Sequence, residues 1–162
     1  MSRFFPVTDD STATFLFADI AGFTALTEAH GDEEAVQLVE DFAAAVQAEL
    51  PSVDGQHIKT IGDALMLRIP DPVDAIRLGV WITRAAMGGH QAPSVRVGAN
   101  HGSAVERAGD YFGTTINIAA RVSALARGAS FSLPGPPPHS RPISTACSTS
   151  LAAGIAWSPR RN

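Results

Sequence analysis

Two aspartates stand in apolar surroundings, where a bare negative charge would be costly. Asp19 lies in the segment Phe-Ala-Asp-Ile-Ala-Gly-Phe-Thr, and Asp63 lies in Lys-Thr-Ile-Gly-Asp-Ala-Leu-Met. A carboxylate among strand-forming residues normally has a cationic partner. Taken singly, Asp19 is better explained as the N-cap of a following helix and Asp63 as a turn residue. Taken together, they indicate a site for divalent metal ions, because Mg²⁺ prefers oxygen ligands.

Four further residues carry groups that could bind a phosphorylated ligand. Lys59 is the only lysine of a chain that has eleven arginines. Asn117 and Arg121 are four positions apart, hence on one face of a predicted helix, where an amide and a guanidinium suit a sugar oxygen and a phosphate. Asp110 lies between Gly109 and Gly113. The plainer explanations are a solvated polar stripe for the helical pair, a turn for Asp110 and an exposed hairpin position for Lys59.

The elements that would position these residues can be predicted from hydrophobic spacing and turn residues. We expect a buried strand at 14–18, a helix from Asp32 to Pro51 and a hairpin whose turn is Gly62-Asp63. Asp71-Pro72 should then begin a helix with Val73, Ile76, Val80 and Met87 on one side. A strand at 94–100, a short strand at 104–107 and a helix from Thr114 or Thr115 to about 127 follow.

This order of elements predicts an α+β fold of the ferredoxin-like type, an antiparallel sheet with its helices on one face. In such a fold the end of the first strand lies beside the tip of the neighbouring hairpin. Asp19 and Asp63 should therefore converge, although 44 positions separate them. Two carboxylates there could share metal ions.

Composition bounds the class of protein. A chain of 162 residues fits one domain, and a net charge of -4 argues against nucleic-acid binding. No stretch approaches the roughly 20 apolar residues of a membrane span, and no secretory leader is evident, so we expect a cytoplasmic protein without membrane contact. The single cysteine, Cys147, excludes an intrachain disulfide.

Charge and proline divide the chain near residue 128. All 16 acidic residues precede this point, whereas six of the 11 prolines follow it. We therefore expect an N-terminal extension at 1–11, a folded domain at 12–128 and an irregular Pro/Ser-rich tail at 129–162.

Three motifs together resemble, in order and spacing, the catalytic motifs of class III adenylyl and guanylyl cyclases: Phe-Ala-Asp-Ile-Ala-Gly-Phe-Thr, Lys-Thr-Ile-Gly-Asp-Ala and Gly-Asp-Tyr-Phe-Gly-Thr-Thr-Ile-Asn-Ile-Ala-Ala-Arg-Val. The resemblance covers roughly residues 12 to 128. It implies that the ribose 3′-oxygen of ATP attacks the α-phosphorus and releases pyrophosphate and 3′,5′-cyclic AMP. It also implies residue roles. Asp19, Asp63 and the main-chain carbonyl of Ile20 would bind two Mg²⁺ or Mn²⁺ ions, and Lys59 and Asp110 would bind the adenine. Asn117 would orient the ribose, and Arg121 would stabilise the charge on the α-phosphate in the transition state.

The same resemblance implies a partner and a substrate preference. Family members act as head-to-tail dimers in which one subunit supplies the metal ligands and the other supplies the remaining groups. Because this chain carries all six of these residues, we expect a homodimer with two equivalent sites. Guanylyl cyclases of the family typically have Glu and Cys where this chain has Lys59 and Asp110. An ammonium donates and a carboxylate accepts, which complements N1 and the N6 amino group of adenine, so ATP ranks before GTP.

The tail departs from the family pattern. After Arg127-Gly128 the family continues with a Gly-Glu-rich turn, a strand and a hairpin whose basic loop can contact the triphosphate. Here the sequence is Ser-Phe-Ser-Leu-Pro-Gly-Pro-Pro-Pro, so we expect altered or missing C-terminal strands. The alternative function is accordingly a catalytically impaired nucleotide-binding or dimerisation module of the same fold. A palm-type polymerase or diguanylate cyclase ranks lower, because its Gly-Gly-acidic-acidic-Phe signature is missing.

Overall fold

The apolar run near the N-terminus forms the central strand of the sheet. In the computed structural model, which describes residues 12–85, 94–126 and 130–132, strand β1 spans Ala13–Ile20. Its residues from Ala13 to Ala18 are all buried. A strand that reads as continuously apolar is covered on both faces, unlike a strand with one wet face, which alternates.

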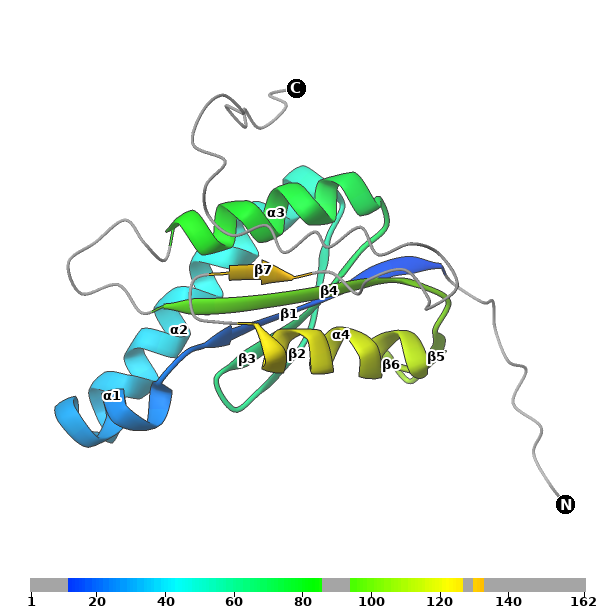
Figure 1. Cartoon of the computed structure of the whole chain (residues 1–162). Coiled ribbons are helices and arrows are strands. Elements are labelled where there is room, and N and C mark those ends of the chain that lie inside the picture. The colour runs from blue at the N-terminus through cyan, green and yellow to red at the C-terminus, as the bar shows by residue number, and fades with distance from the viewer. Residues whose placement is uncertain (1–11, 86–93, 127–129, 133–162) are drawn as a thin grey trace, which may run out of the picture.

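Five strands form the main sheet in the order β2-β3-β1-β4-β7 (Figure 1). All neighbouring pairs are antiparallel except β4 and β7, which are parallel. The other four strands are β2 (Gln56–Ile61), β3 (Ala64–Ile69), β4 (Val95–Gly102) and β7 (Ser130–Ser132). The predicted hairpin is confirmed. The strand predicted at 94–100 corresponds to β4 and continues two residues further, through His101 and Gly102.

Helices cover both faces of this sheet. On one face, helices α2 (Asp32–Glu49) and α3 (Pro72–Ala85) pack over Leu16 and Ala18 of β1. On the other face, helix α4 (Thr114–Leu125) packs over Phe15 and Phe17 (Figure 1). The antiparallel α+β fold is confirmed, but the expectation that all helices share one face is wrong in this respect. Successive β1 side chains point to opposite faces of the sheet, and apolar side chains lie on both faces, so each face needs an apolar cover.

Helix α4 approaches the sheet closely because β4 has a glycine beneath it. A Cβ atom built on Gly98 would lie 2.1 Å from the main-chain nitrogen of Ser123 and 2.8 Å from the carbonyl oxygen of Ala119. No side chain fits in that space without moving the helix backbone. Gly98 therefore sets the distance between β4 and α4.

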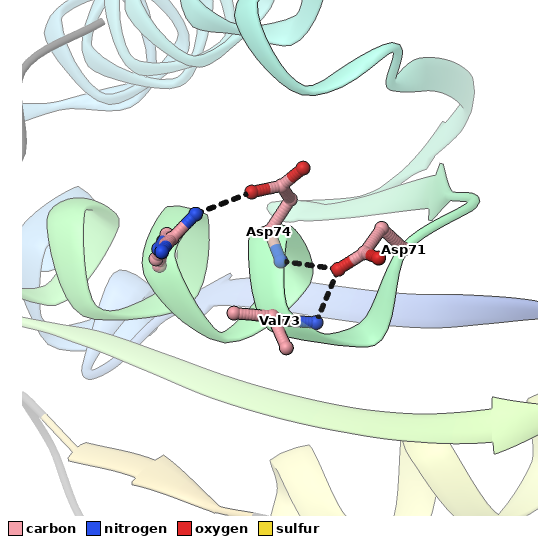
Figure 2. A network of polar contacts seen from close by, with 4 residues as sticks. Asp71, Val73 and Asp74 are labelled. Atoms are coloured by element: carbon pink, nitrogen blue, oxygen red, sulfur yellow. Dashed lines mark hydrogen bonds and ion pairs between the residues drawn. The ribbon is translucent and has the colours of Figure 1, made fainter.

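The start of α3 is capped as the sequence predicts. The carboxylate of Asp71 accepts hydrogen bonds from the main-chain nitrogens of Val73 at 2.7 Å and Asp74 at 3.1 Å (Figure 2). Two apolar residues of the predicted side, Val73 and Ile76, are exposed and do not pack on the sheet. The face that packs on the sheet includes small residues at helical spacing, which allow close contact; its buried members are Ala75, Leu78, Gly79, Ile82 and Thr83. Met87 lies outside the described residues.

A short helix that the sequence reasoning did not predict follows β1. Helix α1 spans Phe23–His30, and its N-cap is Gly22 in a left-handed conformation with φ 77°. Asp19 is therefore not the N-cap of the following helix. Helix α2 ends at Glu49, and a 3₁₀ turn, η1 (Leu50–Val53), which contains the predicted helix stop Pro51, follows it.

The second sheet is a small hairpin of β5 (Val105–Arg107) and β6 (Asp110–Phe112). β5 was predicted, whereas β6 was not. Neither predicted threonine caps α4, because its N-cap is Gly113 without a side-chain bond, and the Thr115 hydroxyl donates to the carbonyl of Ser103 at 2.6 Å.

The expected irregular tail contains one strand, β7, which pairs with β4 over Arg96 to Gly98. The prediction of irregular structure is wrong for these three residues. The remainder of the tail, the N-terminal extension and the segment 86–93 lie outside the described residues.

Candidate active site

Asp19 lies near the end of β1, on the face of the sheet that α4 covers. Phe15 and Phe17 belong to the same alternating set and pack in the core beneath that helix. In the ladder Asp19 is opposite Ala64 of β3 on one side and Arg96 of β4 on the other. Its carboxylate accepts a hydrogen bond from the Arg96 guanidinium, and only 17% of the Asp19 side chain is exposed. The cationic partner expected for this carboxylate is thus an arginine of the same chain.

Asp63 lies at the tip of the hairpin between β2 and β3. Gly62, with φ 62°, provides the left-handed conformation that this tight turn requires. The next residue, Ala64, pairs with Asp19, so the ladder itself brings Asp63 beside Asp19.

The two carboxylates influence each other. Burial raises the pKa of Asp63, its own backbone hydrogen bond lowers it, and the charge and hydrogen bond of Asp19 raise it further, while the positive charge of Arg96 lowers it. The predicted convergence of Asp19 and Asp63 is confirmed. A divalent cation would relieve the repulsion between the two carboxylates, so this donor set fits Mg²⁺ or Mn²⁺.

The other predicted metal ligand, Ile20, can contribute only its main chain, because its side chain is 1% exposed and belongs to the core. The described part of the chain has no group of three or more His, Cys, Asp or Glu side chains arranged to hold a metal ion. Further ligands for a bound ion would therefore come from main-chain oxygens, water or the substrate, as is usual for Mg²⁺.

Lys59 and Asp110 form an ion pair, although 51 positions separate them. The Nζ atom of Lys59 donates to Oδ2 of Asp110 at 2.5 Å. The hydrogen bond from Lys59 lowers the pKa of Asp110, and the main-chain nitrogen of Tyr111, which donates at 2.8 Å, lowers it further. The carboxylate is thereby kept ionised and acts as a hydrogen-bond acceptor.

Local structure explains why these two side chains meet. The pairing of β2 with β3 shifts register between His57 and Lys59, and a bulge of this kind changes the direction of a side chain. On the other strand, the ring of Tyr111 packs against Phe15 with centroids 5.3 Å apart and fixes β6 on the sheet. Lys59 also lies 5.9 Å from the centre of the Phe112 ring.

Asn117 and Arg121 lie on the exposed side of α4, opposite the buried Ile116, Ala119 and Ser123. The prediction that they share one face of a helix is confirmed. Within the described residues, no hydrogen bond or ion pair joins either side chain to the carboxylate pair or to Lys59 and Asp110. The chain thus presents three separate sets of groups.

Arg96 is the residue that the sequence reasoning missed. It lies in Ser-Val-Arg-Val-Gly, where it is the only charge inside an apolar strand. The argument that drew attention to Asp19, a charge among strand-forming residues, applies equally to Arg96. Applied to Arg96, it would have marked this residue as a candidate partner, although the contact itself depends on the register of β1 with β4.

Comparison with known proteins decides the family. The model of the adenylate and guanylate cyclase catalytic domain matches residues 6–134. The chain belongs to this family. The resemblance of its three motifs to class III cyclases is thereby confirmed, and catalytic domains of this cyclase family generally use divalent metal ions.

Among the relatives of this cyclase domain are two bacterial adenylate cyclases. A pH-sensitive adenylate cyclase of Mycobacterium tuberculosis is 37% identical over 122 residues, which are 75% of this chain and 30% of that protein. An adenylate cyclase of Streptomyces coelicolor is 34% identical over 110 residues, 68% of this chain and 29% of that protein. The chain thus spans about three-tenths of the length of these relatives.

Solved structures of cyclases share the fold. The catalytic core of a rhodopsin-guanylyl cyclase with converted specificity, in complex with ATPαS, has a TM-score of 0.71 at 19% identity and covers 76% of each chain. An adenylyl cyclase from P. aeruginosa has a TM-score of 0.64 at 23% identity, over 75% of this chain and 76% of that chain. In the described part of this chain, no helix is both long and apolar enough to cross a membrane.

Proposed function

We propose that the chain is an adenylate cyclase catalytic domain that converts ATP to 3′,5′-cyclic AMP and pyrophosphate. The observation that carries this proposal is the Lys59–Asp110 pair, which combines a donor and an acceptor at the positions that the family uses for the base. The adenylate cyclases among the relatives support the same substrate.

In this mechanism Asp19, Asp63 and the main-chain carbonyl of Ile20 would hold two Mg²⁺ or Mn²⁺ ions. When bound, these ions lower the pKa of the ribose 3′-hydroxyl and neutralise triphosphate charge. Lys59 donates to N1 of adenine, and the ionised Asp110 accepts from the N6 amino group. These two contacts orient the nucleoside and disfavour guanine, which presents the opposite pattern.

Two residues of α4 complete the site. Asn117 orients the ribose so that its 3′-oxygen lies in line with the α-phosphorus, and Arg121 stabilises the charge that develops on the α-phosphate. Because these side chains lie apart from the carboxylate pair within one chain, the active site is assembled between two copies in a head-to-tail homodimer. One copy provides Asp19 and Asp63, and the other provides the remaining four.

The test is formation of cyclic AMP from ATP with Mg²⁺ or Mn²⁺, measured beside nucleotide binding under the same conditions. Arg121→Ala should lower kcat on the order of 10²- to 10³-fold, the cost of removing one preorganised electrostatic group. Arg84→Ala, which removes an exposed arginine from the end of α3, is the matched control and should leave kcat unchanged. Equal loss in both variants would contradict the assignment of Arg121.

A second candidate is a nucleotide-binding or dimerisation module with little catalysis. It is favoured by the sequence after Gly128, which lacks the acidic turn of the family and is rich in proline. Binding of ATP without turnover would support this function, whereas cyclic AMP formation that Arg121→Ala removes would exclude it.

A further inference from the structure

Arg96 is hydrogen-bonded to the Asp19 carboxylate, which the proposed function assigns to metal binding. Arg96 on β4 is directly opposite Asp19 on β1, and its guanidinium donates to Oδ2 of Asp19. The side chains are only 31% and 17% exposed. Water and salt screen such a pair less than a pair on the open surface, so the contact is electrostatically significant.

The positive charge of Arg96 reaches both carboxylates. It opposes the effects of burial and of Asp19 on Asp63. Two carboxylates and one guanidinium carry a net charge of -2 + 1 = -1, so Arg96 halves the charge of the pair. Its Nε atom is buried and has no hydrogen-bond partner among the described residues. The guanidinium is therefore only partly satisfied where it lies.

We propose that Arg96 is the counter-ion of the acidic pair in the metal-free protein and that a divalent cation binds by displacing its guanidinium from Asp19. The proposal rests on the proposed function in one respect only, that Asp19 and Asp63 bind a divalent cation. Arg96 then weakens metal binding and neutralises part of the carboxylate charge until the metal binds. It competes with the metal and does not serve as a ligand.

Two physical reasons support competition. A carboxylate oxygen that accepts from a guanidinium has less electron density to offer a metal, and the guanidinium repels an approaching cation. A residue that merely positioned Asp19 would have the opposite effect, because its removal would loosen the site and weaken metal binding. The direction of the change in affinity therefore separates the two roles.

The experiment titrates the full chain with Mn²⁺ alone, without nucleotide, and measures free Mn²⁺ by electron paramagnetic resonance. Arg96→Gln should bind Mn²⁺ about tenfold more tightly, which corresponds to ~1.4 kcal/mol. Arg68→Gln is the matched control: Arg68 lies on β3 against the Tyr111 ring and makes no ion pair with Asp19, so the affinity should not change. Asp19→Asn should lose binding in both backgrounds.

The proposal would be overturned if Arg96→Gln bound Mn²⁺ with an affinity equal to or weaker than that of the unmodified chain. This conclusion requires that the variant unfold at the same temperature as the unmodified chain. The absence of Mn²⁺ binding by both proteins would overturn it as well. Should the variant fail to fold, nuclear magnetic resonance of the arginine side chains in the unmodified chain decides. Mg²⁺ should shift the Arg96 signal, and an unmoved signal at saturating Mg²⁺ would contradict displacement. Mn²⁺ binding without cyclic AMP formation would contradict the proposed function and leave this inference standing.

Discussion

Lys59 and Asp110 form a hydrogen bond with each other. Their side chains are 39% and 31% exposed, and ion pairs with such access to water contribute little to stability. A nucleotide base can therefore separate them at little cost. In the proposed complex each keeps its bonding role, because the ammonium still donates and the carboxylate still accepts.

The base preference can be tested by exchanging this pair. The double variant Lys59→Glu with Asp110→Cys should lower the ratio of kcat/KM for ATP over GTP by at least about tenfold, because an unmatched donor or acceptor at the base costs ~1 to 3 kcal/mol. Activity with both nucleotides is the measurement. Lys59→Arg, which retains a cationic donor, serves as the control and should still prefer ATP. Unchanged discrimination in the double variant would contradict the assignment.

Charged residues in apolar segments are the informative signal in the sequence. The prediction included Asp19 and Asp63 but not Arg96. Asp19 and Asp63 could be predicted to meet, because their positions at a strand end and a hairpin tip follow from local patterns. The partner of Asp19 could not be assigned from those patterns, since Arg96 is opposite it only once the register of β1 with β4 is known. The contact of Lys59 with Asp110 likewise depends on a bulge and a hairpin that no periodicity specifies.

The elements show which patterns define structure and which do not. The hairpin of β2 and β3 was predicted with its correct turn, because Gly62-Asp63 lies between two strand-forming segments. The short helix α1 was missed because it lies between Gly22 and Gly31 and buries no residue. The apolar spacing of Val73 and Ile76 does not identify the face of α3 that packs on the sheet, because smaller residues allow closer packing there.

Close packing at Gly98 makes a prediction about the contact of β4 with α4. Gly98→Ala should lower the free energy of unfolding by about 1 to 3 kcal/mol, the usual cost of overpacking, because its Cβ would collide with helix backbone. Denaturant unfolding at fixed protein concentration measures the change. Gly102→Ala is the matched control on the same strand. Its Cβ would meet only the side chain of Thr115, which can rotate, so the loss should be smaller.

The cap of α3 gives a second prediction at this scale. Asp71→Ala removes an acceptor for two main-chain nitrogens and should cost about 1 kcal/mol of stability (Figure 2). Asp71→Asn keeps an oxygen acceptor and should cost only a few tenths of a kcal/mol. Chemical denaturation of both variants tests this. Equal destabilisation would indicate that the charge near the helix end is what matters.

At the scale of the whole molecule, the proposed site is divided between two copies of the chain. The carboxylate pair lies at one end of β1, whereas Asn117 and Arg121 lie on the outer side of α4. A head-to-tail arrangement with twofold symmetry would place each set against the other twice. Each dimer would then have two equivalent sites.

Mixing two inactive proteins tests this division. A heterodimer of Asp63→Ala and Arg121→Ala contains one site with both defects and one intact site. Random exchange at equal concentrations makes half of the dimers heterodimers, so about one quarter of the unmodified activity should return. Either variant alone should remain inactive under the same conditions. No recovery at any mixing ratio would contradict a site shared between subunits.

The single lysine, Lys59, can be labelled selectively by amine chemistry. Since the chain has no other lysine, an amine-specific acylating reagent can modify only one side chain, and that side chain is the one paired with Asp110 beside the Phe112 ring. If this pair binds the base as proposed, bound ATP should protect Lys59 from acylation. The extent of labelling at Lys59 would then measure how much of the protein has nucleotide bound.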